Sequence, residues 1–218
     1  MRRLLDAFFV TLFVCTSVYA PSTALASAPD AGTASSDVVP LWLPAPSARR
    51  ILVIGDSEAC AIAPYVRQID RTLQADLGGP PDDIDIECKV STTVQYWGAQ
   101  GNLQLALGRH PKPDAVVVFL GTNHYWQRDV APDVSPILKL IASRGAPCTW
   151  VGNTAVRGRK WPINGLLKAA VTPQCTYFDT EAANIELHDG IHPTRQGATK
   201  WIRLVWPMIP SKYEQEHE

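Results

Sequence analysis

The sequence has almost no excess of charge of either sign. Its 218 residues include 20 Lys and Arg against 21 Asp and Glu, which gives a formal net charge of -1 at pH 7. Proteins that bind nucleic acid usually carry a basic stripe, and proteins held at a membrane surface often carry a polybasic patch. The balanced charge therefore gives no support for a nucleic-acid partner or for binding to a membrane surface.

Several glycine and cysteine motifs are also absent. The chain has no Walker glycine motif, no dinucleotide-binding glycine pattern and no internal repeat. No two cysteines stand in a CxxC pair, which is the spacing typical of zinc and redox sites. The absence of these motifs gives no support for nucleotide binding or for zinc or redox chemistry.

The apolar run near the N-terminus is short for a membrane span, which needs about 20 residues. It follows a pair of arginines, and Ala-Leu-Ala at residues 24–26 fits a small-x-small cleavage site. We therefore predict that residues 1–26 are a secretory signal peptide and that the protein is secreted or periplasmic, with no stable membrane insertion after cleavage. The alternative is an uncleaved membrane anchor.

The rest of the chain suits one folded domain with short extensions. Residues 27–48 are rich in Ala, Ser, Pro, Gly and Thr and predict a flexible linker. Hydrophobic residues make up 46% of the sequence, enough for a substantial core. We expect the folded domain at residues 49–210 and a C-terminal tail at residues 211–218.

Four cysteines remain after the predicted cleavage, and four cysteines allow three pairings. The segments "CTWVGN" and "CTYFDT" each place a cysteine at the entry of a predicted strand. If those strands are neighbours in a parallel sheet, Cys148 and Cys175 lie side by side, which leaves Cys60 and Cys88 as the other pair. The alternative is four free, buried thiols.

Short apolar runs alternate with segments of helical periodicity along the domain. Such alternation predicts right-handed crossover units and a parallel sheet covered on both faces. We expect an α/β protein with a flavodoxin-like, five-stranded parallel sheet in a three-layer α/β/α sandwich. The predicted strands lie at residues 50–55, 84–90, 114–121, 148–153 and 176–180, and the predicted helices at residues 58–77, 102–109, 134–143, 164–171 and 194–205.

Candidate functional residues follow four of these strands, at the edge of the sheet where ligands bind in such folds. Ser57 is a nucleophile if a base takes its proton, and His192 is a suitable base with Asp189 to orient it. Acyl transfer also needs donors for the developing oxyanion. The backbone N–H groups of Ser57 and Gly98 and the side-chain amide of Asn123 are the donors we predict.

Each of these residues has a plainer interpretation. Ser57 could cap the following helix, and Asn123 could be a left-handed turn residue. Gly98 could be a simple turn residue, and Gly101 is the alternative glycine of the same loop. Asp189 and His192 could have a capping role or bind a metal, with His188 and Asp179 as further ligands.

Taken together, "GDS" after the first strand, "GTN" after the third and "DGIHPT" near the end resemble the SGNH (GDSL-type) hydrolase family. The resemblance covers residues 49–210 and implies a three-layer α/β fold and a serine esterase mechanism without metal or organic cofactor. It implies Ser57 as nucleophile, His192 as general base and Asp189 as its orienting acid, with Ser57, Gly98 and Asn123 forming the oxyanion hole.

The sequence departs from the family pattern at two positions. Glu58 stands where the family often has leucine, and it could shape substrate choice or only decorate the start of the helix. His124 follows Asn123 where the family often has Asp or another polar residue.

Aromatic residues in the predicted active-site loops could stack on a sugar ring, although packing or lid roles are common for loop tryptophans. These aromatics are Tyr96, Trp97, Tyr125, Trp126 and Trp161. We name Trp97, His124 and Trp126 as candidate substrate-binding residues. The "RGRK" segment at residues 157–160 could meet an anionic substrate or be a solvated surface.

We expect a serine esterase that removes small acyl groups, such as acetyl, from a carbohydrate or cell-envelope glycan. The substrate is therefore a small-molecule or glycan ester. A lipolytic esterase, lysophospholipase or thioesterase that acts on longer chains is the alternative enzyme. An alternative of another class is a non-catalytic glycan-binding module.

Overall fold

The computed structural model describes residues 47–124, 129–154 and 162–210. The predicted signal peptide, nearly all of the predicted linker and the predicted tail lie outside these residues. Within the described ranges, none of the helices has both the length and the apolar character that a membrane crossing requires.

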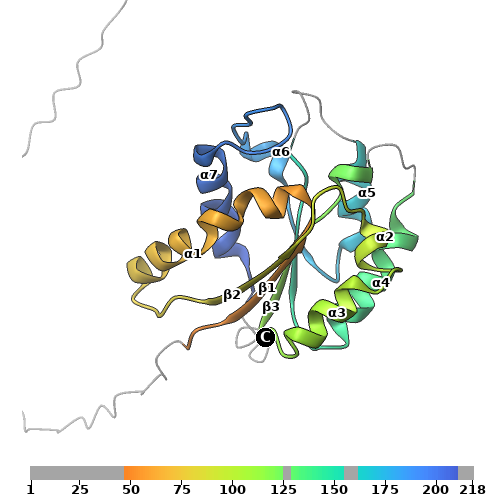
Figure 1. The fold of residues 1–218 in the computed structure, drawn as a ribbon, viewed down its shortest axis with the longest axis horizontal. Helices are drawn as coiled ribbons and strands as arrows, with labels where there is room; N and C mark the ends of the chain where they lie inside the picture. The colour runs from red at the N-terminus through yellow and green to blue at the C-terminus, as the bar shows by residue number, and fades with distance from the viewer. Residues whose placement is uncertain (1–46, 125–128, 155–161, 211–218) are drawn as a thin grey trace, which may run out of the picture. The chain divides into compact units, whose positions relative to one another are not determined.

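The described residues form a five-stranded parallel sheet with helices between its strands (Figure 1). The strand order is β2-β1-β3-β4-β5, the flavodoxin-like order, so the predicted fold class is confirmed. The strands are β1 (Arg50–Gly55), β2 (Asp83–Cys88), β3 (Ala115–Phe119), β4 (Cys148–Val151) and β5 (Thr176–Phe178). The α-helices are α1 (Ser57–Leu77), α2 (Val94–Trp97), α3 (Asn102–Arg109), α4 (Ala131–Ala142), α5 (Pro162–Val171), α6 (Thr180–Ala183) and α7 (Arg195–Val205), with 3-10 turns η1 (Thr122–His124) and η2 (Trp206–Met208).

The central strands are apolar on both faces because helices cover both sides of the sheet. Leu52 and Ile54 of β1 belong to one cluster of buried residues, and Ile51 and Val53 belong to another. Helices α1 and α7 contribute to the second cluster, while α3, α4 and α5 contribute to the first, on the opposite face. This alternation gives the three layers of the sandwich.

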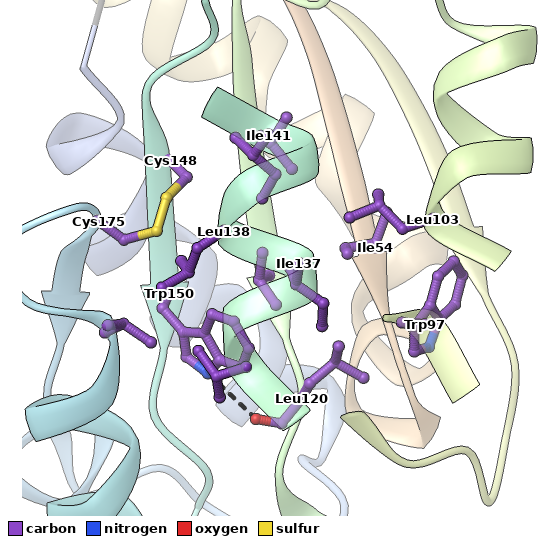
Figure 2. Packing of buried hydrophobic residues seen from close by; sticks show 14 of the residues in the cluster. Ile54, Trp97, Leu103, Leu120, Ile137, Leu138, Ile141, Cys148, Trp150 and Cys175 are labelled. Carbon is purple, nitrogen blue, oxygen red and sulfur yellow. Dashed lines mark hydrogen bonds between the residues drawn. A yellow bond between two sulfur atoms is a disulfide. The ribbon is translucent and has the colours of Figure 1, made fainter. Parts of the chain in front are cut away.

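The first cluster is centred on Trp150 of β4, which is fully buried (Figure 2). Its indole N–H donates to the Leu120 carbonyl at 3.2 Å, which satisfies the one polar atom of the side chain. Ile137 and Ile141 of α4 belong to the same cluster. The apolar face of α4 therefore packs into the first cluster, on one face of the sheet.

Two disulfides join the cysteines in the predicted pairs, Cys148–Cys175 and Cys60–Cys88. Cys148 begins β4 and Cys175 immediately precedes β5, its neighbour in the sheet. The sequence separations are 27 and 28 residues, for which loop-closure entropy predicts a stabilisation of about 3–4 kcal/mol per disulfide. Disulfides form and persist in oxidising compartments.

Gly55 explains how the chain turns sharply from β1 into α1. A Cβ atom at this position would lie 2.5 Å from both the Ala59 Cβ and the Phe119 carbonyl oxygen. Any larger residue would therefore push α1 away from the end of the sheet. The close approach places Ser57, the first residue of α1, at the carboxyl edge of the strands.

Candidate active site

Ser57 is the first residue of α1, but it does not cap this helix. The cap is Asp56, whose Oδ1 accepts the Glu58 N–H at 3.0 Å. The Ser57 side chain is partly exposed, in contrast to Asp56 and Glu58 on either side of it. The capping alternative for Ser57 is therefore wrong, and this partly exposed residue lies at the positive end of a 21-residue helix.

Asp189 and His192 form a compact hydrogen-bonded unit in the loop before α7. Asp189 Oδ1 accepts the backbone N–H groups of Ile191 at 2.9 Å and of His192 at 2.7 Å. Asp189 Oδ2 lies 2.6 Å from His192 Nδ1. The His192 backbone N–H and then its ring hold the pKa of the Asp189 carboxyl well below its usual range. The ionised carboxylate therefore favours the tautomer with its proton on Nδ1, which leaves Nε2 able to accept a proton.

The alternative roles of these two residues find little support in the structure. Thr194 caps α7 by accepting the Gly197 N–H at 3.0 Å, so neither Asp189 nor His192 serves as its cap. Among the described residues, His188, Asp189 and His192 could hold a metal ion, since their ligand atoms lie within 4.8 Å of one another. Both Asp189 oxygens already accept hydrogen bonds, and the fourth candidate, Asp179, instead caps α6.

The start of α1 and the loop of His192 are joined through Thr154, which follows β4. Glu58 Oε1 accepts the Thr154 N–H at 3.1 Å and lies 2.7 Å from Thr154 Oγ1. Thr154 Oγ1 in turn lies 2.8 Å from the carbonyl oxygen of Ile191. The residue after Ser57 and the residue before His192 thus meet at one edge of the sheet. The Ser57 hydroxyl and the His192 ring share no hydrogen bond among the described residues, which is common in unliganded sites.

Asn123 connects the loops that follow β2 and β3. It lies in η1, and its Nδ2 donates to the Thr92 carbonyl at 2.8 Å. The side chain is partly buried, and its amide carries a second N–H. The side chain therefore braces the edge of the site and keeps one donor for a ligand.

The structure contradicts Gly98 as an oxyanion donor. Its N–H donates to the Val94 carbonyl at 2.9 Å, as the cap of α2, and a Cβ atom at Gly98 would lie 3.1 Å from the Asp133 carbonyl. The loop after β2 folds into α2, a helix that the sequence analysis did not predict, and Gly98 packs against α4. The alternative, Gly101, donates its N–H to the Gly98 carbonyl at 3.0 Å.

Ser91, in the loop after β2, is a candidate donor that the sequence analysis did not identify. It lies three residues beyond the end of β2, is exposed, and has a left-handed φ of 59°. Strained φ values outside glycine cluster at functional sites. The next residue, Thr92, accepts the Asn123 side chain, so the Ser91 backbone lies beside the second predicted donor. Its place directly after the predicted strand at residues 84–90 is the sequence signal for this role, although the family pattern favours a glycine in this loop.

Two of the three candidate substrate-binding residues are buried, so their predicted contact with substrate is wrong. Trp97 is 4% exposed and donates its indole N–H to Thr92 Oγ1 at 3.1 Å. His124 is 1% exposed, and its Nδ1 accepts the Val94 N–H at 3.4 Å. Burial lowers the pKa of His124, so its ring is neutral and supports the loop after β2. Trp126, like Tyr125, Trp161 and residues 157–160, lies outside the described residues.

Two buried acids, Asp56 and Glu58, flank Ser57. This burial fits neither of the two roles predicted for Glu58. Asp56 and Glu58 are both 0% exposed. Burial raises the pKa of Asp56, and the charge of Glu58 raises it further. Burial likewise raises the pKa of Glu58, against the hydrogen bonds from Thr154. Glu58 is therefore neither a surface decoration of the helix nor a direct contact for substrate.

Comparison with solved structures shows that the chain has the fold of the SGNH hydrolases. TesA has a TM-score of 0.56 and 21% identity, with 72% of this chain and 96% of that chain covered. The acetyl xylan esterase AlAXEase has a TM-score of 0.59 and 13% identity, with 72% and 98% covered. The C-terminal catalytic domain of peptidoglycan O-acetyltransferase A (OatA) of Streptococcus pneumoniae has a TM-score of 0.51 and 18% identity, with 77% and 99% covered. No protein-family model matches the sequence, and a search of curated proteins found no match.

Proposed function

We propose that the protein is a serine esterase in which Ser57, His192 and Asp189 form the catalytic triad. The observation that carries this proposal is the Asp189–His192 unit, with a 2.6 Å contact between carboxylate and ring, held at the sheet edge where Ser57 begins α1. In this proposal, the unit supplies a base with a fixed tautomer for the Ser57 hydroxyl.

The reaction follows from the position of each group. His192 Nε2 takes the proton of the Ser57 hydroxyl as Oγ attacks the ester carbonyl carbon, which gives a tetrahedral oxyanion. The imidazolium then gives the proton to the leaving alcohol, and an acyl-enzyme remains. Water attacks this ester with His192 again as base, and the acid leaves as Ser57 recovers its proton. Asp189 stays ionised and stabilises the imidazolium.

The oxyanion hole in this proposal consists of the Ser57 N–H, the Asn123 side-chain amide and the backbone N–H of Ser91. Ser91 replaces Gly98, whose N–H is bonded to the Val94 carbonyl. Among the described residues, the Ser91 N–H has no hydrogen-bond partner, so it is open to a ligand. Donors fixed before the reaction stabilise the developing charge without reorganisation.

Replacement of Asn123 by alanine tests this hole. The variant loses an oxyanion donor, and we expect kcat to fall by about 10²- to 10³-fold. The matched control is Asn102→Ala, because Asn102 Nδ2 also donates to a backbone carbonyl, that of Tyr96 in α2 at 2.8 Å, but Asn102 is not one of the proposed oxyanion donors. Kinetics on p-nitrophenyl acetate check both variants. A kcat that falls equally in the two variants would mean that Asn123 only braces its loop.

For the substrate, we favour small acyl groups, acetyl above all, on a carbohydrate or cell-envelope glycan. Two structural neighbours support this choice by their own names, one an acetyl xylan esterase and the other a peptidoglycan O-acetyltransferase. The two disulfides are consistent with a secreted or periplasmic protein that meets such glycans outside the cytoplasm.

A comparison of acyl chain lengths separates this substrate class from a lipolytic one. We expect p-nitrophenyl acetate to be hydrolysed with a higher kcat/KM than the octanoate, and acetylated glycans to release acetate. An esterase, lysophospholipase or thioesterase for long chains would show the reverse order. Faster cleavage of the octanoate would therefore overturn the deacetylase preference and leave the serine mechanism intact.

A further inference from the structure

Glu58 is a fully buried acid next to the proposed nucleophile, and the mechanism above makes no use of it. It is 0% exposed and is the second residue of α1. The SGNH hydrolase family, which the sequence resembles, often has leucine at this position. A carboxyl group buried at such a position is costly unless it is hydrogen-bonded or neutral. Its contacts therefore indicate what it does.

The contacts around Thr154 contain one hydroxyl proton too few for an ionised Glu58. Thr154 Oγ1 lies 2.7 Å from Glu58 Oε1 and 2.8 Å from the Ile191 carbonyl oxygen. A carboxylate and a carbonyl only accept, and a threonine hydroxyl has a single proton to donate. If Glu58 were ionised, one of these two short contacts would bring two oxygen lone pairs together with no hydrogen between them. A proton on Glu58 Oε1 gives each contact a hydrogen, from Glu58 to Thr154 and from Thr154 to Ile191.

Burial favours the neutral form of Glu58 and outweighs the neighbouring groups that favour its charged form. Asp56, beside it in sequence, is a second buried acid. Burial above all raises the pKa of Tyr177 of β5, and the charge of Glu58 adds to this rise, so its phenol stays neutral. The charge of His192 acts in the opposite direction but ranks below burial in its effect on the pKa of Glu58. The nearby Thr122 hydroxyl donates to Asn153 Oδ1 at 3.1 Å.

The carbonyl that ends this chain belongs to the peptide group that carries His192. The oxygen of the group is the Ile191 carbonyl, held by Thr154 at 2.8 Å. The nitrogen is the His192 N–H, held by Asp189 at 2.7 Å. The peptide plane is therefore fixed from both ends, and with it the point from which the His192 ring extends.

We propose that Glu58 is a neutral carboxylic acid, and that the chain Glu58–Thr154–Ile191 positions the base His192. The role as a positioning residue rests on the proposed esterase function, whereas the protonation of Glu58 does not. When Glu58 ionises at alkaline pH, it loses the proton that it donates to Thr154. The Thr154 hydroxyl then turns to the carboxylate and releases the Ile191 carbonyl.

Carbon-13 NMR of the whole chain labelled at glutamate Cδ tests the protonation state. The Glu58 resonance is assigned by its absence in Glu58→Gln. We expect it to keep the chemical shift of a protonated carboxyl at pH 7, where an ordinary glutamate is ionised. The same result is expected in Ser57→Ala, so this readout does not depend on turnover. A carboxylate shift at pH 7 overturns the proposal.

Steady-state kinetics test the positioning role. Thr154→Val removes the hydroxyl at nearly constant volume, and we expect a fall in kcat of about 10- to 100-fold with KM unchanged. Thr154→Ser keeps the hydroxyl and should retain most of the kcat. Glu58→Gln removes the ionisable proton. Its amide nitrogen can donate to Thr154 Oγ1 but, unlike Oε1, cannot accept the Thr154 N–H, so we expect a reduced kcat that no longer declines at alkaline pH.

The outcomes separate this proposal from the proposed function. Wild-type kcat in a folded Thr154→Val variant overturns the positioning role, and so does an unchanged alkaline decline in Glu58→Gln. Near-ultraviolet circular dichroism establishes that each variant is folded, and Thr154→Ser supports the proposal only if it restores kcat. Undiminished turnover in Ser57→Ala would instead overturn the esterase mechanism and leave the NMR result for Glu58 in place.

Discussion

Ser57→Ala should lose ester hydrolysis while its fold remains intact. The substitution removes the nucleophilic oxygen, and the loss of a triad nucleophile lowers kcat by at least about 10³-fold. Asp56, not Ser57, caps α1, so the variant keeps the cap and its helix. Turnover of p-nitrophenyl acetate and far-ultraviolet circular dichroism measure the two effects.

The matched control for this variant is Ser143→Ala, because Ser143 is an exposed serine at the end of α4. Its hydroxyl only donates to the Leu140 carbonyl at 2.7 Å, so its loss should leave turnover unchanged. Equal activity of Ser57→Ala and wild type would remove the proposed nucleophile. If the wild type binds acylated glycans but hydrolyses no ester, the non-catalytic module becomes the better hypothesis.

His192→Ala should lower kcat/KM by at least about 10³-fold, since the serine hydroxyl then has no base. In the wild type, we expect kcat/KM to rise with pH through the range in which histidine loses its proton, about pH 5 to 8. Asp189 does not contribute to this rise. Its lowered pKa keeps it ionised over the whole range, and its hydrogen bonds to His192 are lost only in much stronger acid.

A histidine away from the site provides the control for this prediction. His110 Nδ1 lies 2.7 Å from Asp85 and its Nε2 lies 3.1 Å from Glu87, in a cluster that does not include the triad. His110→Ala should therefore keep the rise of kcat/KM with pH. A flat profile of the wild type between about pH 5 and 8 would count against a histidine base.

Much of the fold could be predicted from the periodicity of the sequence, because each central strand is apolar on both faces and each long helix on one. The helix at residues 102–109 has the predicted bounds. Helix α4 begins at Ala131, three residues before the predicted start, since Pro132 is tolerated in a first helical turn. The four-residue helices α2 and α6 were missed because they are too short to show a period.

In the candidate site, features that depend on local contacts could be predicted from the sequence, whereas features that depend on distant contacts could not. Asp189 and His192 are three residues apart, so their pairing follows from a local turn. Gly98 is excluded as an oxyanion donor, and Trp97 is buried, because α2 packs against α4. No local sequence pattern predicts this packing. Glu58 contacts a residue 96 positions away, and for this reason its burial could not be predicted from the sequence.

Labelling with a fluorophosphonate, followed by mass spectrometry of the peptides, tests the central claim most directly. Such reagents react with a serine hydroxyl only where a base and an oxyanion hole activate it. We expect one label on the peptide that contains Ser57, no label in Ser57→Ala and much slower labelling in His192→Ala. A label on another residue, or none on the folded protein, would contradict the account of Ser57 as an activated nucleophile.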